Sequence, residues 1–420
     1  MSNALKISAR LSTPILLLAL MVLGCSKPMP EEGMWTGTLA MPESRLLPFQ
    51  MYLDLRGIAP TGYFINGPER TPIPEIYRRD DSLIFVFSEY RAAMHGVWKN
   101  GQLSGEFLRF RKDTISTSFA AEPAPEAQAT ATAPSELLPP LAGKFQVYFR
   151  KDDLVDSLTT ATFWTRGDSV FGTFIATDGD LGLLAGKRSA GTLLLSRFTG
   201  WQANMLELRH EQGHWYGKYF ARTNAPVFFS IQARTSLPKE APGAKKTTMK
   251  NPKEKFLFSG VRITGDTLTQ ADARFKGKAL IVDIMGTWCH NCMDAAPLLE
   301  RLYREFKTQG LEVVGLSFEL TNDFTAARKN LLLYEERYGI TYTLLFCGMT
   351  ESSNVDARLN AQLNNFFAYP TTLFIDPNGI VQDIHVGFKG PGIGEEYQQQ
   401  VQLFYDSVRK LLKGKLASKK

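Results

Sequence analysis

Hydrophobic positions follow different patterns in the two halves of the chain. Before residue 236, short runs either alternate apolar and polar residues, as in Leu206-Glu207-Leu208, or form brief apolar stretches such as Leu83–Phe87. Glycine, asparagine and aspartate separate these runs, and no helical period recurs. The pattern predicts antiparallel strands joined by turns, arranged as sandwiches or small barrels.

The pattern changes after residue 255. An apolar run at 279–285 ends in a turn, and residues 293–306 then place leucines and a phenylalanine on one helical face. Further patterns predict strands at 311–318 and 342–346, a helix at 323–338, a hairpin of 371–376 with 380–386, and a helix at 396–412. Strands alternating with helices, followed by a hairpin, predict an α/β domain with a mixed sheet.

Two segments have the composition of linkers. Residues 120–140 are rich in Ala, Pro, Thr and Glu, and residues 236–254 are rich in Lys, Pro and Gly. We therefore predict a β-rich domain 1 at 33–119, a β-rich domain 2 at 141–235, and the α/β domain at 255–420.

Domain 2 is expected to repeat domain 1. Three residues recur 110 positions later: Gly33 as Gly143, Gly62 as Gly172, and Leu83 as Leu193. Conserved spacing of this kind predicts a duplicated structural unit. The alternative is chance similarity between two β-rich stretches.

The first 24 residues have the layout of a secretory signal. Lys6 and Arg10 precede an apolar run at 15–23, which is too short to cross a bilayer as a helix. Val22-Leu23-Gly24-Cys25 resembles the cleavage motif of bacterial lipoproteins. This resemblance implies that residues 1–24 are removed, that a lipid on Cys25 anchors the chain in the cell envelope, and that the chain faces the periplasm. An ordinary signal peptide with an incidental cysteine is the alternative.

The overall composition is that of a globular protein, with 44% hydrophobic and 21% charged residues. The formal charge of +6 reflects 48 Lys and Arg against 42 Asp and Glu. Much of the excess lies in a linker and the C-terminal tail, where charge serves solvation, so we predict no nucleic-acid partner.

The chemistry of the chain centres on Cys289 and Cys292. The pair follows a buried strand and opens a helix, which brings both sulfurs onto one helical turn and is expected to leave Cys289 exposed. The helix N-terminus favours a thiolate at Cys289, and a protonated His290 would add to this effect. Cys289 is therefore the predicted nucleophile and Cys292 the resolving thiol. Half of a zinc site is the alternative, but no second ligand pair at zinc-finger spacing accompanies it.

The residues around this pair resemble the TlpA/ResA-like family of membrane-tethered thiol-disulfide oxidoreductases, within the thioredoxin superfamily. The resemblance covers about residues 255–412, a little over a third of the chain. It rests on Asp283, Gly286-Thr287-Trp288, Pro297, and Tyr369-Pro370-Thr371-Thr372. It implies a thioredoxin-like fold for the α/β domain.

Two carboxylates are candidates for proton transfer. Asp283 stands among Ile and Val and is expected to be buried with a raised pKa, suited to exchange a proton with Cys292. Glu319 resembles the acidic residue that the family places beside its site. The alternatives are a structural buried aspartate and a solvated loop glutamate.

Other residues are expected to shape the site. The resemblance implies a cis peptide at Pro370 that exposes the backbone of Tyr369 to an extended substrate. Pro297 is expected to kink the helix. The His290-Asn291 pair between the cysteines differs from the Gly-Pro of ordinary thioredoxins, which leaves the redox direction open.

These features predict a protein-disulfide oxidoreductase, acting as a reductase, that requires no metal or organic cofactor. By family analogy its partners are disulfide-containing envelope proteins, apocytochromes c among them, and a membrane electron donor. The competing hypothesis is an envelope binding or assembly protein whose redox domain acts only on a partner held by the β domains.

The string His210-Glu211-Gln212-Gly213-His214 fits a zinc-protease motif, but Gly213 favours a turn.

Overall fold

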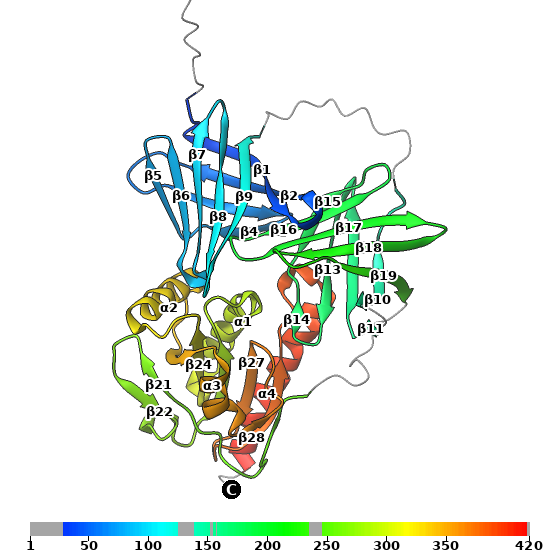
Figure 1. Cartoon of the computed structure of the whole chain (residues 1–420). Helices are drawn as coiled ribbons and strands as arrows, with labels where there is room; N and C mark the ends of the chain where they lie inside the picture. The colour runs from blue at the N-terminus through cyan, green and yellow to red at the C-terminus, as the bar shows by residue number, and fades with distance from the viewer. Residues whose placement is uncertain (1–27, 125–137, 152–153, 157, 235–245, 418–420) are drawn as a thin grey trace, which may run out of the picture.

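The computed structural model describes residues 28–124, 138–151, 154–156, 158–234 and 246–417 (Figure 1). The predicted signal peptide and Cys25 lie outside the described residues. So does most of each predicted linker.

The first β domain is a nine-stranded antiparallel sheet that curls into an incomplete barrel. Its order is β4-β3-β2-β1-β9-β8-β7-β6-β5, so β4 and β5 form its two edges. The strands are β1 (Glu32–Met41), β2 (Arg45–Asp54), β3 (Thr61–Asn66), β4 (Glu69–Pro72), β5 (Glu75–Arg79), β6 (Ser82–Phe87), β7 (Ala92–Lys99), β8 (Gln102–Phe110) and β9 (Thr114–Pro123). The short helical turns η1 (Pro42–Ser44) and η2 (Ser88–Tyr90) interrupt them.

The second β domain closes its ring, because β19 pairs with β10 as well as with β18. Its order is β11-β10-β12-β13-β15-β16-β17-β18-β19, with β14 paired to β13. The strands are β10 (Gly143–Lys151), β11 (Leu154–Asp156), β12 (Thr160–Arg166), β13 (Ser169–Ala176), β14 (Gly179–Asp180), β15 (Leu184–Lys187), β16 (Leu193–Phe198), β17 (Ala203–Glu211), β18 (His214–Ala221) and β19 (Val227–Arg234). His210 and His214 lie on opposite strands of the β17–β18 hairpin, and Gly213 is in its turn.

The two β domains share one strand register. Gly62 pairs with Leu53 in the first, and Gly172 pairs with Phe163 in the second, each residue displaced by 110 positions. In both pairs the glycine makes room for the facing side chain, since a Cβ would meet Leu53 or Phe163 at under 3.0 Å. The equivalent pairing, and the requirement for glycine at the equivalent position in both domains, support the proposed duplication.

The C-terminal domain is an α/β domain with the sheet order β22-β21-β25-β24-β23-β27-β28. Its central strands β23, β24 and β25 are parallel, and β27 and β28 form the predicted hairpin. The sheet strands are β21 (Ser259–Arg262), β22 (Thr267–Thr269), β23 (Ala279–Met285), β24 (Leu311–Glu319), β25 (Thr343–Met349), β27 (Thr371–Ile375) and β28 (Val381–Val386). The helices are α1 (His290–Phe306), α2 (Phe324–Tyr338), α3 (Ser352–Val355) and α4 (Glu395–Ala417), with short turns η3 (Ala273–Phe275), η4 (Lys307–Gln309), η5 (Asp356–Asn360) and η6 (Pro391–Ile393).

The predicted second linker ends in ordered structure. Its residues Thr248–Met249 form β20, which pairs antiparallel with β26 (Leu363–Asn364). Composition predicts a linker through residue 254, and the pairing partner more than a hundred positions away explains why local sequence does not reveal this strand.

The two faces of the C-terminal sheet carry separate cores. Ala279, Ile281 and Met285 of β23 pack with α1, α2 and α4, whereas Leu280, Val282 and Ile284 pack on the other face. The first of these cores continues without interruption into the first β domain through Phe87 and Tyr90. Both β domains therefore lie over the end of the C-terminal domain where α1 begins (Figure 1).

Candidate active site

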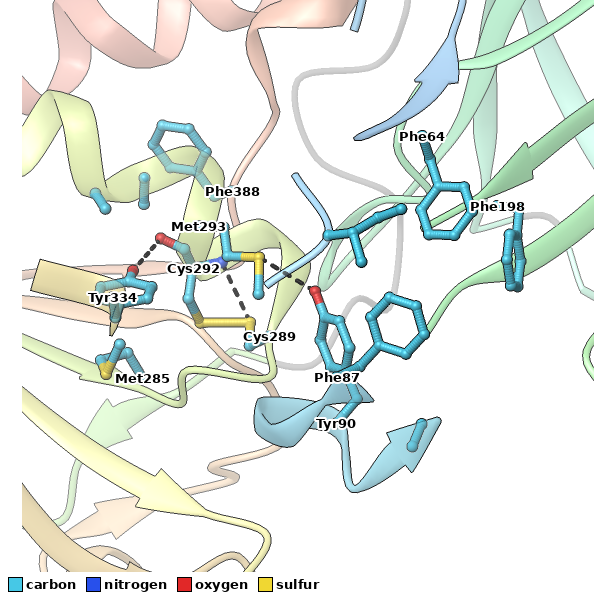
Figure 2. Close-up of a cluster of buried hydrophobic side chains, with 14 of the residues drawn as sticks. Phe64, Phe87, Tyr90, Phe198, Met285, Cys289, Cys292, Met293, Tyr334 and Phe388 are labelled. Atoms are coloured by element: carbon cyan, nitrogen blue, oxygen red, sulfur yellow. Dashed lines mark hydrogen bonds between the residues drawn. A yellow bond between two sulfur atoms is a disulfide. The ribbon is translucent and has the colours of Figure 1, made fainter. Parts of the chain in front are cut away.

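Cys289 and Cys292 form a disulfide at the start of α1 (Figure 2). Their Cα atoms are 5.2 Å apart, within the range that a disulfide requires. Cys289 is the N-cap residue of the helix, and its sulfur accepts a hydrogen bond from the backbone N–H of Cys292 at 3.2 Å. The positive end of the helix thus points at the sulfur of Cys289, which favours its thiolate in the reduced protein.

The expected exposure of Cys289 is wrong. Only 6% of Cys289 is exposed, and Cys292 is completely buried. A helix N-terminus in an isolated domain would leave the first cysteine open to solvent, but here residues from both β domains cover it. The local motif could not predict this covering, because the covering residues are distant in the sequence.

The covering residues from the first β domain are aromatic. Tyr90 lies in η2, and its hydroxyl donates a hydrogen bond to Sδ of Met293 at 3.5 Å (Figure 2). Met293 directly follows Cys292 in the chain. Trp201, from the second β domain, stacks on Tyr90 with ring centres 5.5 Å apart. Tyr90 is therefore fixed between the other β domain and the active-site helix.

The second β domain contributes polar groups to the same face. The carbonyl of Asp178 accepts a hydrogen bond from Asn291 at 3.3 Å, and the carboxylate of Asp180 accepts one from the backbone N–H of Gly390 at 2.6 Å. Arg197 brings its Nη2 atom to 3.3 Å from Nδ1 of His290. We call Tyr90, Asp178, Asp180 and Arg197 the cap.

His290 is held between opposite charges. Its Nε2 atom lies 3.1 Å from Asp294, and Arg197, which also forms an ion pair with Glu69, approaches from the second β domain. Burial opposes protonation of His290, but the charge and hydrogen bond of Asp294, together with the charge of Asp180, raise the histidine pKa. Burial, followed by repulsion from Asp294, raises the pKa of Asp180 to about 6. His290 therefore lies among charges from the C-terminal domain and the second β domain.

Asp283 is buried on β23, with 2% of its surface exposed. It accepts a hydrogen bond from the hydroxyl of Thr372 at 2.8 Å, across the β23–β27 pair. Burial raises its pKa to about 7. Strand alternation places Asp283 with Ile281 and Met285 on the face that α1 covers, the helix that carries Cys292.

Glu319 is buried at the end of β24, which excludes a solvated loop carboxylate. It accepts hydrogen bonds from the backbone N–H of Thr287 at 3.0 Å and from the Thr287 hydroxyl at 2.7 Å. Burial raises its pKa against the effect of these bonds. Glu319 therefore fixes the loop that leads into Cys289.

The loop that leads into β27 has the predicted backbone. The Tyr369–Pro370 peptide is cis. Tyr369 packs edge-on against Trp288 with ring centres 5.4 Å apart, and Trp288 donates a hydrogen bond to the carbonyl of Phe318 at 2.8 Å. Pro297 lies inside α1 as expected.

Further polar contacts join the β domains to the C-terminal domain away from the cysteines. Lys329 on α2 binds Glu75 at 2.8 Å, and Arg337 at the end of α2 lies 3.4 Å from the buried Glu89. Lys144 of the second β domain binds Glu395 at 2.8 Å. These ion pairs add to the contacts between the β domains and the C-terminal domain.

Comparison with known proteins agrees with this geometry. Residues 252–384 match the model of the AhpC/TSA family. The thioredoxin-like protein YneN of Bacillus subtilis is 29% identical over 130 residues, which are 31% of this chain and 68% of that protein. The C-terminal domain is thioredoxin-like. The thiol-disulfide oxidoreductase ResA of Geobacillus kaustophilus is 29% identical to it over 113 residues, covering 27% of this chain and 57% of ResA.

One more relative of the thioredoxin-like domain is named for disulfide chemistry, and one solved structure is reported beside it. The thiol:disulfide interchange protein DsbE of Escherichia coli is 29% identical over 178 residues, 40% of this chain and 86% of that protein. A crystal structure of a thiol:disulfide interchange protein of the thioredoxin family from Chlorobium tepidum is 22% identical, covers 40% of this chain and 99% of that one, and has a TM-score of 0.28.

In the part of the chain that the structure describes, no group of three or more His, Cys, Asp or Glu side chains is arranged to hold a metal ion. Within the same residues, no helix combines the length and apolar character needed to span a membrane. Cys347 is buried, and burial raises its pKa to about 12, which makes it a poor nucleophile.

Proposed function

We propose that this protein is a thiol-disulfide oxidoreductase that uses Cys289 and Cys292 to reduce disulfides of envelope proteins. The observation that carries the proposal is the redox-capable pair at the start of α1, in a domain whose Tyr369–Pro370 peptide is cis. The names of the matched relatives support the reaction class. The chain spans about two thirds or less of several of these relatives, so the activity of the whole protein remains our proposal.

The reaction begins from the reduced pair. The Cys289 thiolate attacks one sulfur of the substrate disulfide, forming a mixed disulfide and releasing the first substrate thiolate. The Cys292 thiolate then attacks the sulfur of Cys289, which releases the second substrate thiolate and leaves the Cys289–Cys292 disulfide. The substrate gains two electrons and the protein loses two, so a dithiol donor at the membrane must reduce the pair again.

Asp283 is the proposed base for the second step. A carboxyl group with a pKa near 7 holds and releases a proton at neutral pH, and its strand places it under the helix of Cys292. It takes the proton from the Cys292 thiol before that sulfur attacks. Glu319 supports the step by fixing Thr287, and Trp288 and Tyr369 shape the surface where the substrate docks.

The location follows from the sequence motif. We propose that Cys25 carries a lipid and holds the protein in the bacterial envelope, facing the periplasm. In that compartment, disulfide-containing proteins, apocytochromes c among them, are the proposed substrates.

The burial of Cys289 favours a second candidate, in which the redox domain acts only on a partner that the β domains bind. A substrate disulfide cannot reach a sulfur that is 6% exposed, so the cap must move before exchange. In this candidate, binding of a specific partner to the β domains provides the energy for that movement.

Trapping tests both candidates. Cys292→Ser leaves the nucleophile but removes the resolving thiol, so mixed disulfides should accumulate on Cys289 in cells and be released by dithiothreitol. The double variant Cys289→Ser/Cys292→Ser is the matched control and should trap nothing. Many trapped proteins would support a general reductase, and one dominant partner would support the second candidate. The absence of any trapped species would contradict both.

A further inference from the structure

Arginine side chains gather where the two β domains meet, near Trp201, which stacks on Tyr90. Arg109 and Arg111 lie at the end of β8, and Arg222 follows β18. The guanidinium carbons of Arg111 and Arg222 lie 4.6 and 4.2 Å from the centre of the Trp201 ring. Both domains therefore supply positive charge to one small region.

Arg109 occupies a position that an apolar residue normally fills. It lies on the inward face of β8, in alternation with the buried Leu103 and Phe107, and only 6% of it is exposed. Its Nη2 atom donates to the hydroxyl of Thr223 at 3.1 Å, but its Nε donor is buried and has no partner. A buried arginine with an unused donor is costly unless a further acceptor is present.

Arg111 shows the same deficit. Its Nη1 atom donates to the carbonyls of Tyr90 and Phe110, at 3.2 and 3.0 Å, while its Nη2 atom is buried without a partner. Among the described residues, no carboxylate forms an ion pair with Arg109, Arg111 or Arg222. Cation–π contacts with Trp201 offset part of the charge but accept no hydrogen bond.

The charges also repel one another. Burial, and then the nearby Arg109, lowers the pKa of Arg222 to about 10, and the same two causes lower the pKa of Arg111. Like charges gathered in this way are favourable only when a negative group lies between them. An oxyanion can accept hydrogen bonds from buried N–H donors that lack partners, such as Arg109 Nε and Arg111 Nη2.

We propose that Arg109, Arg111 and Arg222 bind an oxyanion, the phosphate or carboxylate group of a small ligand, at the junction of the two β domains. The ligand enters beside the exposed Thr223 and accepts the unused hydrogen bonds of Arg109 and Arg111. Because Trp201 stacks on Tyr90, and Tyr90 contacts Met293, ligand binding strengthens the junction that carries the cap. The site does not depend on the proposed redox function.

The test measures binding of inorganic phosphate and of acetate to the full chain by calorimetry, with chloride keeping the ionic strength constant. Thermal unfolding is followed under the same conditions. The variants are Arg109→Met and Arg222→Met, and Arg79→Met, an exposed arginine on β5, is the matched control. Phosphate or acetate should bind the natural protein and the control, and each cluster variant should bind about tenfold more weakly or worse.

Stability separates a binding site from a structural one. If the cluster is an anion-binding site, Arg109→Met removes an uncompensated buried charge. The variant should then melt at a higher temperature in chloride than the natural protein does. Phosphate should not raise its melting temperature further. Arg109→Lys keeps the charge and should retain part of that increase. A preference for phosphate assigns a phosphate-bearing ligand, and a preference for acetate assigns a carboxylate. Equal binding by Arg109→Met and Arg79→Met, or no binding of either anion, would overturn the proposal.

Discussion

The thioredoxin-like domain contains the Cys289–Cys292 disulfide, and the two β domains lie against it. The two parts provide different kinds of group around the disulfide. The thioredoxin-like domain supplies both sulfurs, the helix N-terminus, the cis loop at Pro370 and the buried Asp283. The β domains supply Tyr90 and Arg197, which contact Met293 and His290, the residues next to the cysteines. One side thus carries the reacting atoms, and the other determines access and local charge.

This division predicts that changes on the two sides fail differently. A change in the thioredoxin-like domain should slow the chemical steps. The rate at which reagents reach the disulfide should stay unchanged. A change in the cap should alter that rate while leaving the chemistry intact. The three predictions below test each side and then the residue at which the sides meet.

The largest of these effects is expected at Asp283. Asp283→Asn removes the proposed base, so resolution of a mixed disulfide should slow by about 100-fold at pH 8. In the natural protein this rate should rise with pH and level off above the aspartate pKa of about 7, and the variant should lack that inflection. Stopped-flow measurement of resolution from pH 5 to 9 checks both points. Asp406→Asn, an exposed residue on α4, is the control.

The same substitution has a signature in stability. The pKa of Asp283 is higher in the folded protein than in the unfolded protein, so the folded state binds the proton more tightly. Its contribution to the free energy of unfolding is complete below about pH 4 and is lost as the pH rises toward 7, by about 1.4 kcal/mol per pH unit. Asp283→Asn should flatten this slope in urea unfolding. An unchanged slope would mean that the carboxyl is not buried as described.

The difference between the two sides also explains what the sequence was able to predict. Strands and helices of the thioredoxin-like domain follow local periodicity, and Cys289, Cys292 and Pro370 lie in short motifs with a direct physical meaning. The barrel form of the β domains required long-range pairing such as β10 with β19, which no local pattern encodes. The cap required contacts between residues about 100 to 200 positions apart, such as Tyr90 with Met293. Local sequence therefore indicated the redox chemistry but did not indicate that the β domains bury the cysteine pair.

The second prediction breaks the cap. Arg337→Glu places a carboxylate against the buried Glu89, so repulsion should separate η2 from α2. Reduction of the Cys289–Cys292 disulfide by dithiothreitol should then accelerate by about tenfold, because the opened population rises. The exchanged pair Glu89→Arg/Arg337→Glu restores opposite charges and should return the rate toward that of the natural protein.

The charge exchange distinguishes opening from damage. A variant that had merely unfolded would not recover when the charges are swapped, and its far-UV circular dichroism would change. Glu351→Arg, an exposed change of charge in the thioredoxin-like domain, serves as a control and should leave the rate as it is. Equal rates in Arg337→Glu and the natural protein would show that Glu89 and Arg337 do not hold the cap.

The smallest effect is expected at His290, where the two sides meet. A protonated imidazole next to Cys289 stabilises its thiolate and hence the reduced state, although Asp294 neutralises part of that charge. His290→Gln should therefore make the reduction potential more negative by about 30 mV at pH 6. Equilibration with glutathione buffers measures the shift, and His385→Gln, the same change on β28, should produce none. Because Asp294 raises the pKa of His290, the difference should persist near neutral pH and fade only as the pH rises further and the imidazole loses its proton. A shift that stayed constant up to pH 9 would mean that His290 acts through packing against the cap, and the charge from Arg197 and Asp294 would then have no part in setting the potential.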